Sequence, residues 1–401
     1  MVTRKEMTPF RHGLLWFGAA ISIAEIVLAT LLAPLGFKRA LAAIVIGHAI
    51  GGAMMFLAGL IGARTRGGAM ETVKIAFGAR GGHFFSALNI TQLVGWTAVM
   101  IAVGAAAANS VWQGVDPATF AIALGALTGL WVYVGKENIG GFNFVAVMAL
   151  FGLSLLASRV VFGGAGGGSF GETALPVAGE MTFARAVELS AVMPLSWLPL
   201  ISDYTRDAKS RPVRTTLVGV VAYSVASCWM YALGVGLALY AGGDGVALAM
   251  GKAGFGVAAI VIVVASTFTT TYLDVFSAGV SAASIDRRIP EKRAALVVCA
   301  VGTLVAVCFA DTGKYESFLL FIGSVFAPMI AVQVTDFYVL GNRAVSAKPP
   351  CLPFIAWALG FAAYRLVMHF DVMTPLGISL PVIAFTALVY WLLRAAMTKK
   401  A

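Results

Sequence analysis

Long runs of apolar residues, separated by short polar segments, follow one another along almost the whole chain. A helix needs about 20 apolar residues to cross the hydrocarbon core of a bilayer, and twelve runs approach or exceed this length. The predicted spans are 11–34, 40–63, 82–108, 117–134, 139–162, 182–203, 213–241, 253–285, 294–310, 315–340, 353–370 and 376–396. The pattern therefore predicts an all-α polytopic membrane protein with twelve transmembrane helices.

The composition fits a lipid environment rather than water. Hydrophobic residues make up 60% of the chain and charged residues 11%, against roughly 25% charged residues in soluble domains. The net charge is +10, but no basic cluster is interleaved with aromatic residues as on a nucleic-acid-binding surface. We expect contact with the lipid bilayer and none with nucleic acid. The oligomeric state stays open, and a monomer is compatible with the sequence.

Basic residues fall mainly on one side of the predicted spans, and cytoplasmic loops retain positive charge. With the N-terminus inside, the 28 Lys and Arg residues lie in inside segments except for Lys38, Arg39, Arg159, Arg185, Lys252, Lys314 and Arg365. We therefore expect both termini in the cytoplasm and a multi-pass protein of the bacterial inner membrane. The first apolar run reaches full span length without a small-residue cleavage pattern, which favours a span over a signal peptide.

The order of the spans suggests an internal repeat. Many secondary transporters consist of two inverted repeats of helices followed by peripheral helices, and a Gly-rich segment separates the first five predicted spans from the next five. We predict a first repeat over residues 1–162, an extracellular loop over 163–181, a second repeat over 182–341 and two peripheral helices over 342–401.

This repeat model requires the first helix of each half to be interrupted near mid-membrane. Span one carries small residues from Gly18 to Ser22, and span six carries Pro194 and Pro199, each of which removes a backbone donor. Gly and Pro are also common in uninterrupted membrane helices. Because the weak points occupy corresponding positions in both halves, we predict true breaks.

Two carboxylates inside spans are candidates for function, because charge in a membrane is costly. Glu25 lies centrally in span one without a basic residue within a helical turn. Its partner could be a proton, a cation, a hydrogen-bonding solute, or a distant basic residue such as His48. Asp203 and Asp336 lie at helix ends instead, where capping or salt bridging is expected and a structural or gating role follows.

The second carboxylate, Asp274, ends a hydroxyl-rich stretch that begins at Ser266. Neutral oxygens suit a hard cation such as sodium, and carbonyls freed at the break in span one could complete its shell. Alternatively, these hydroxyls bond to carbonyls of their own helix or to neighbouring helices.

Two tryptophans lie at mid-depth, away from the interfaces where membrane tryptophans gather. Trp96 and Trp197 could hold a flat heterocycle by stacking, although a central Trp also serves as plain packing. Gln92 lies one helical turn before Trp96 and could read a polar ring edge.

These residues resemble the nucleobase:cation symporter-1 family along essentially the whole chain. The segment PLSWLPLISDYTR at 194–206 is similar to the sixth-helix signature of that family, with support from FSAGV at 276–280 and from Pro328 and DFY at 336–338. Within the family, the chain length and AISIAE at 20–25 look most like the CytX-type branch, proposed to carry the hydroxymethylpyrimidine precursor of thiamine.

The resemblance implies a 5+5 inverted-repeat fold, LeuT-like, with a base stacked between Trp96 and Trp197. It implies that Glu25, Gln92 and Asp274 read the edge of the base, and Ser22 and Ser196 at the helix breaks complete the predicted solute site. It also implies a sodium site from carbonyls of span one and hydroxyls of span eight. The corresponding positions are Gly18, Ile21, Ser266, Thr269 and Thr270.

Carboxylates at these positions favour a solute that presents donors, as a 4-aminopyrimidine does. We therefore predict a symporter that imports hydroxymethylpyrimidine or cytosine by alternating access, with sodium as coupling ion and no other cofactor. The alternative is a proton-coupled cytosine or purine permease in which Glu25 or Asp274 titrates.

A membrane-embedded enzyme or a channel is the rival class. The dispersed histidines His12, His48, His83 and His369 show no ligand spacing, the four cysteines are scattered, and no symmetric filter loop indicates a channel. The sequence therefore predicts no enzyme activity.

Overall fold

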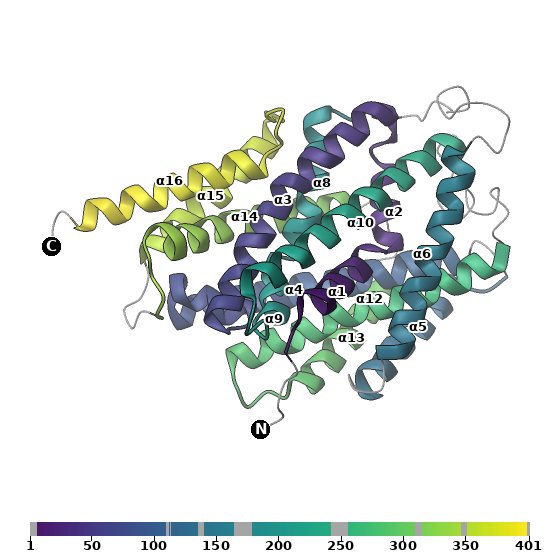
Figure 1. Cartoon of the computed structure of the whole chain (residues 1–401), viewed down its shortest axis with the longest axis horizontal. Helices are drawn as coiled ribbons and strands as arrows, with labels where there is room; N and C mark the ends of the chain where they lie inside the picture. Colours follow the sequence, from purple (N-terminus) through teal and green to yellow (C-terminus); the bar gives the residue numbers. More distant parts are fainter. Residues whose placement is uncertain are drawn as a thin grey trace.

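The computed structural model describes residues 6–109, 112, 114–134, 140–163, 179–241, 256–308, 315–345 and 351–398. This part of the chain is built from helices (Figure 1). They are α1 (Pro9–Ala20), α2 (Ile23–Thr30), the 3-10 helix η1 (Ala33–Leu35), α3 (Phe37–Thr65), α4 (Ala69–Asn109), α5 (Pro117–Val134), α6 (Gly140–Phe162), α8 (Phe183–Ser196), α9 (Leu198–Thr205), α10 (Pro212–Ala241), α12 (Gly256–Ile285), α13 (Glu291–Cys308), α14 (Tyr315–Val334), the π-helical turn η3 (Thr335–Val339), α15 (Cys351–His369) and α16 (Ser379–Thr398). Most of the predicted loop at 163–181 lies outside the described residues.

Each of the twelve predicted spans falls on one helix or on two or three consecutive helical elements. Within the described residues, eight helices are long and apolar enough to cross a membrane, or nine when α1 and α2 count as one bent span. Helix α13 begins with Glu291, Lys292 and Arg293, which lowers its apolar content. The chain is thus a multi-pass helical membrane protein, and the count of twelve stays a prediction.

The predicted break in span one is confirmed. Helices α1 and α2 meet at an angle of 47°, with Ile21 and Ser22 between them. Ser22 takes an extended conformation, and its hydroxyl accepts a hydrogen bond from the Ala24 amide at 3.2 Å. A side-chain N-cap of this kind starts a new helix, so the chain leaves α1 and begins α2 within two residues.

The predicted break in span six is weaker than expected. Helices α8 and α9 are separated only by Trp197, whose backbone keeps right-handed helical angles. Pro194 and Pro199 remove two amide donors, but the Trp197 carbonyl still accepts from the Leu200 amide at 3.0 Å. The helix axis therefore continues, and residues Phe183–Thr205 read as one span.

Helix α4 bends sharply near its N-terminus. Gly78 has φ of +66°, a left-handed value that glycine adopts at low cost. The residues from Ala69 to Phe77 consequently form a short arm at an angle to the long remainder of α4. This arm reaches the ends of α9 and α12, as described below.

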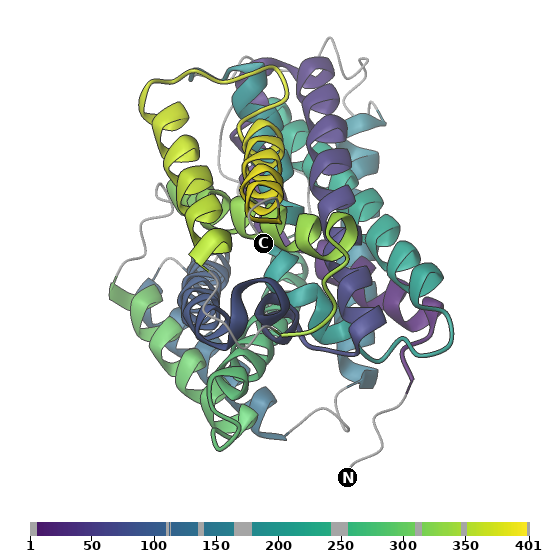
Figure 2. The ribbon, with the colours of Figure 1, turned by 90° about the vertical axis from the view of Figure 1, so that its left-hand side faces the viewer.

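The helices fall into two packed sets with a flank. Helices α4 and α12 pack along each other, with α5 and α13 against them; we refer to these four as the α4 set. Helices α1, α2, α3, α8, α9 and α10 pack together as the α1 set. Helices α15 and α16 lie on one flank against α14 (Figures 1 and 2).

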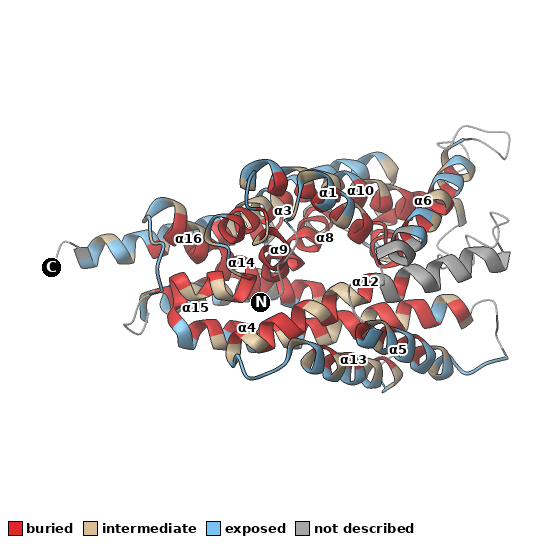
Figure 3. Ribbon diagram, turned by 60° about the horizontal axis from the view of Figure 1, so that its bottom comes forward, coloured by how far each residue is buried: buried red, intermediate tan, exposed pale blue. Residues whose placement is uncertain are grey.

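Burial separates central from lipid-facing helices. Buried residues make up 89% of an apolar 18-residue stretch of the α8–α9 span but only 22% of the corresponding stretches of α15 and α16. Figure 3 shows α8 and α9 almost entirely red. A span surrounded by protein can carry polar groups that lipid would exclude. The interior around α8 and α9 is therefore where a polar site can exist.

Candidate functional site

A small cavity lies between the two helix sets, at the break between α1 and α2 and at the junction of α8 and α9. Its lining residues come from α1, α2, α4, α8, α9 and α12 and from the junctions between them: Ala19, Ser22, Ala24, Glu25, Leu93, Trp96, Met100, Met193, Ser196, Trp197, Leu200, Thr270 and Asp274. The cavity has a volume of about 20 Å³, which is enough for one water molecule. Any larger solute must displace lining side chains.

Six of the seven predicted solute residues line this cavity: Ser22, Glu25, Trp96, Ser196, Trp197 and Asp274. The seventh, Gln92, is buried one helical turn before Trp96, and its amide forms hydrogen bonds with other groups. Its Nε2 donates to Asn89 Oδ1 at 2.8 Å and to the Ser196 carbonyl at 3.4 Å, while Oε1 is buried without a partner among the described residues. The structure thus brings the predicted set together, and the role of each as a solute ligand stays a prediction.

Glu25 is held by helix α10. The Tyr223 hydroxyl donates to Glu25 Oε1 at 2.8 Å, and the Ser227 hydroxyl donates to Oε2 at 2.7 Å. The carboxylate is 3% exposed and has both oxygens engaged, so only its remaining lone pairs face the cavity. Of the partners considered from the sequence, His48 does lie nearby, but it contacts Ser227 rather than Glu25 directly.

Aromatic rings form one wall behind Glu25. The indole N–H of Trp197 donates to the Tyr223 hydroxyl at 3.0 Å, and Trp16 packs edge-on against Trp197 with ring centroids 5.2 Å apart. On α4, Trp96 packs edge-on against Tyr315 and Phe318, with ring centroids 5.7 Å apart in each pair. Both cavity tryptophans are therefore fixed by neighbours that the solute does not provide.

Asp274 differs from Glu25 because no group among the described residues compensates it. The side chain is 4% exposed, and within the described residues it forms no hydrogen bond or ion pair. Thr270, one turn earlier on α12, lines the same cavity. A buried carboxylate without donors is costly, so Asp274 is the lining group most in need of a partner.

The predicted sodium ligands are described only in part. Gly18 and Ile21 are buried at the end of α1, and Thr270 lines the cavity, but the side chains of Ser266 and Thr269 lie outside what the structure describes. Thr271 donates to the Thr267 carbonyl at 2.7 Å, so this hydroxyl serves its own helix. The sodium site stays a prediction.

Sequence reasoning missed the partners of Glu25 on span seven. Tyr223, Ser227 and Tyr231 recur every four residues along α10, which places them on one helix face. All three are buried. A polar stripe at this spacing in an otherwise apolar span was the available signal that α10 faces a polar group.

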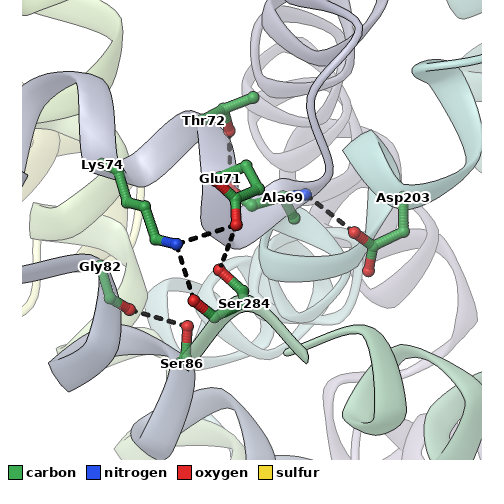
Figure 4. A network of polar contacts seen from close by, with 8 residues as sticks. All are labelled: Ala69, Glu71, Thr72, Lys74, Gly82, Ser86, Asp203 and Ser284. Atoms are coloured by element: carbon green, nitrogen blue, oxygen red, sulfur yellow. Dashed lines mark hydrogen bonds and ion pairs between the residues drawn. The ribbon is translucent and has the colours of Figure 1, made fainter. Parts of the chain in front are cut away.

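The two helix sets are joined by hydrogen bonds on one side of the cavity. We call this side, where α3 ends and α4 begins, the basic face, since Arg64, Arg66 and Arg206 lie there. Asp203 Oδ1 accepts from the Ala69 amide at 2.8 Å and so caps the α4 arm (Figure 4). The capping expected for Asp203 is confirmed.

Four further bonds strengthen this seam. Asn89 donates to the Pro199 carbonyl at 3.2 Å and Gln92 to the Ser196 carbonyl, while Tyr204 and Ser277 connect α9 with α12. Beside them, Lys74 bridges Glu71 and the Ser284 carbonyl at 2.8 and 2.7 Å (Figure 4). The α4 arm is therefore tied to the ends of both α9 and α12.

Asp336, the other carboxylate at a helix end, has a structural position as expected. Its Oδ1 accepts from the Tyr390 hydroxyl at 2.6 Å, and its Oδ2 accepts from Asn342 at 2.8 Å. These bonds fix the π-helical turn η3 to α16.

Comparison with known proteins places this architecture in a family. Residues 3–352 match the family described as permeases for cytosine/purines, uracil, thiamine and allantoin. The chain belongs to this family. Cytosine permeases of Escherichia coli O157:H7 and K12 are each 23% identical to it over 357 residues, which cover 88% of this chain and 83% of the permease.

Solved structures of the nucleobase:cation symporter-1 family confirm the expected fold. The closed form of the family member Mhp1 with bromovinylhydantoin bound superposes with a TM-score of 0.79, at 18% identity and with 95% of this chain and 91% of that chain covered. Its inward-facing form gives 0.77, with 97% and 90% covered. A sodium-coupled sialic acid symporter gives 0.58 at 12% identity, with 94% and 96% covered.

Membership has a direct consequence for function. The chain is a permease of this family and not an enzyme. The boundaries of the two repeats and the assignment to the CytX-type branch stay predictions.

Proposed function

We propose that this transporter imports an aminopyrimidine by alternating access, with sodium as the coupling ion. Hydroxymethylpyrimidine is the favoured solute, in keeping with the CytX-type branch, and cytosine is the other. The proposal includes a location in the bacterial inner membrane with both termini in the cytoplasm. Curated relatives named cytosine permease support the solute class.

The observation that carries this proposal is Asp274, buried on the cavity wall and without a donor within the described residues. A solute that supplies N–H groups would offset the cost of burying this carboxylate. The exocyclic amine of a 4-aminopyrimidine, together with a protonated ring nitrogen, can meet a carboxylate with two parallel hydrogen bonds. Uracil offers no exocyclic amine.

Glu25 and the tryptophans support the same class of solute. Glu25 keeps free lone pairs toward the cavity while Tyr223 and Ser227 hold it. Trp96 and Trp197 line the cavity from different helices, and indole faces suit stacking on a heterocycle. Met100 and Met193, with flexible side chains, are the lining residues best able to yield space for the ring.

Competition for uptake into proteoliposomes tests the solute. Radiolabelled cytosine or hydroxymethylpyrimidine should enter, and unlabelled aminopyrimidines should compete at least tenfold better than uracil. Asp274→Asn should reduce aminopyrimidine uptake strongly and narrow that preference, because the amide replaces an acceptor by a donor. Asp116→Asn, an exposed position outside the cavity, is the matched control. A preference for uracil would contradict the proposal.

The coupling ion is tested separately. Uptake is measured with sodium replaced by choline over a series of pH values. Loss of uptake without sodium at every pH supports the assignment of Thr269 and Thr270, whereas unchanged uptake in choline that responds to a pH gradient would replace sodium by the proton.

A further inference from the structure

Two buried histidines in the α1 set form hydrogen bonds through both ring nitrogens, and they differ in the protons those bonds require. His12 Nδ1 lies 2.8 Å from the Thr215 carbonyl, and Trp16 donates to its Nε2 at 2.8 Å. A carbonyl only accepts and an indole N–H only donates. Neutral His12, protonated at Nδ1, satisfies both bonds.

A neutral imidazole does not satisfy the hydrogen bonds of His48 in the same way. Its Nδ1 lies 2.9 Å from the Ile44 carbonyl, so Nδ1 must carry a proton. Its Nε2 lies 2.6 Å from the Ser227 hydroxyl, and that hydroxyl in turn lies 2.7 Å from Glu25 Oε2. Ser227 has one proton to place in two hydrogen bonds.

The other oxygen of Glu25 cannot supply the missing proton. Trp197 donates to the Tyr223 oxygen, so Tyr223 must direct its own proton to Glu25 Oε1. With ionised Glu25 and neutral His48, one of the two short contacts at Ser227 would join two acceptors. Buried polar groups in contact without a proton between them are strongly unfavourable.

We propose that Glu25, Ser227 and His48 form a binding site for one proton beside the cavity. In one form the proton is on Glu25 Oε2, which donates to Ser227, and Ser227 donates to His48 Nε2. In the other form Ser227 donates to Glu25 and receives a bond from protonated His48 Nε2. Transfer breaks the O–H bond of Glu25 and that of Ser227, and it forms a new O–H on Ser227 and an N–H on His48.

Several other titratable groups face this site. The titratable groups that face the site are Tyr223, Cys228 and Tyr231 of α10, Asp274 of α12 and Tyr315 of α14, with the Tyr231 ring 5.0 Å from the His48 ring. From α4 the cavity receives Leu93, Trp96 and Met100, which do not titrate. Glu188 of α8 is engaged by α16 and Tyr364. Within the described residues, Glu25 forms no ion pair.

The position of this proton would determine how strongly Glu25 accepts hydrogen bonds from a solute in the cavity. While it is on Glu25, that side chain is neutral and weak as an acceptor. Once it is on His48, Glu25 is an anion and attracts donors. Since Glu25 lines the cavity and His48 does not, an entering solute with N–H groups favours the form with protonated His48.

Two spectroscopic measurements on the full-length protein test the site at neutral pH. Nitrogen-15 NMR of labelled histidine reports the protonation of His48, assigned with His48→Gln. Infrared spectroscopy reports a carboxylic acid band, assigned with Glu25→Gln. We expect either a His48 imidazolium or a Glu25 carboxylic acid, and the two signals together account for one proton. Ionised Glu25 together with neutral His48 would overturn the proposal.

Substitution sharpens the test. In Glu25→Gln the new amide can donate to Ser227, so His48 should become wholly neutral, while His12 should stay neutral in both proteins as the matched control. Ser227→Ala should abolish the response of the His48 signal to Glu25→Gln. An imidazolium at His48 that persists unchanged in Glu25→Gln would also overturn the proposal. No solute is needed, so this result is independent of the proposed aminopyrimidine.

Discussion

At the scale of single residues, one hydroxyl orients two lining groups of the cavity. Tyr223 accepts from the Trp197 indole and donates to Glu25, so it fixes an aromatic wall and a carboxylate together. Its own ring is fully buried. A change at Tyr223 therefore acts on the solute through both neighbours without touching the solute itself.

We expect Tyr223→Phe to weaken solute binding by about 1–3 kcal/mol, because Trp197 and Glu25 each lose a buried hydrogen bond. Equilibrium binding to the purified protein measures this. Tyr231→Phe is the matched control, because within the described residues the Tyr231 hydroxyl forms one long hydrogen bond, to the Leu189 carbonyl at 3.5 Å. Equal losses in the two variants would show that Tyr223 acts by general packing.

At the scale of elements, a buried carboxylate attaches the flank to the core. Glu188 of α8 is fully buried, and it accepts from the Ile378 amide at 2.6 Å, from the Ser379 amide and hydroxyl, and from Tyr364. A carboxylate at the N-terminus of α16 also compensates the helix dipole. The peripheral helices are thus bound to the helix that forms part of the cavity.

Glu188→Gln should lower stability by about 2 kcal/mol or more, because an amide nitrogen would face donors at this buried site. A thermal unfolding curve in detergent measures the loss. Glu316→Gln is the control, since Glu316 pairs with partly exposed Arg185 and such pairs contribute about 0–1 kcal/mol. A loss no larger than that of the control would argue against the anchor.

The bend in α4 gives a second prediction at this scale. Gly78→Ala should cost about 1 kcal/mol or more, because alanine disfavours the positive φ at this position. Hydrogen exchange should report faster opening of the 69–77 arm. Gly129→Ala in the middle of α5 meets only Cys299 at 3.9 Å and should leave stability equal or higher. An unchanged arm in Gly78→Ala would contradict this account.

At the scale of the whole molecule, the seam on the basic face determines which way the cavity can open. Asp203→Ala should loosen the α4 arm and raise the accessibility of that side, with Asp203→Asn intermediate. The measurement is the rate of thiol modification at Val280→Cys, a buried position beside Gly68 on this face, in a protein whose four native cysteines are replaced by serine. A several-fold rise is expected.

Asp116→Ala provides the control for this experiment. Asp116 caps the Ala118 amide of α5 at 2.8 Å, the same interaction at an exposed helix start on the opposite side. Its loss should leave labelling at position 280 unchanged. Equal rises in both variants would indicate general loosening rather than an opened seam.

Much of this arrangement could be predicted from the sequence, and the remainder depends on packing. Hydropathy located the spans, and the cost of charge in lipid identified Glu25 and Asp274, both of which line the cavity. The side chain of Gln92 was harder to place, because spacing assigns a face but not a rotamer, and Asn89 competes for its amide. The two prolines of span six suggested a larger break than forms, because Trp197 keeps helical backbone angles.

The partners of Glu25 could not be paired from the sequence alone. Tyr223 and Ser227 lie about two hundred positions away on another span, and only the packing of α2 against α10 brings them together.

The hydrogen-bonded seam on the basic face carries a consequence for leakage. Five bonds, three of them long at 3.3 to 3.5 Å, would favour an empty carrier that is closed on that side. Ions could then cross without a solute only when this seam opens spontaneously. A cell with many copies of such a carrier would then lose little of its ion gradient through the copies that hold no solute.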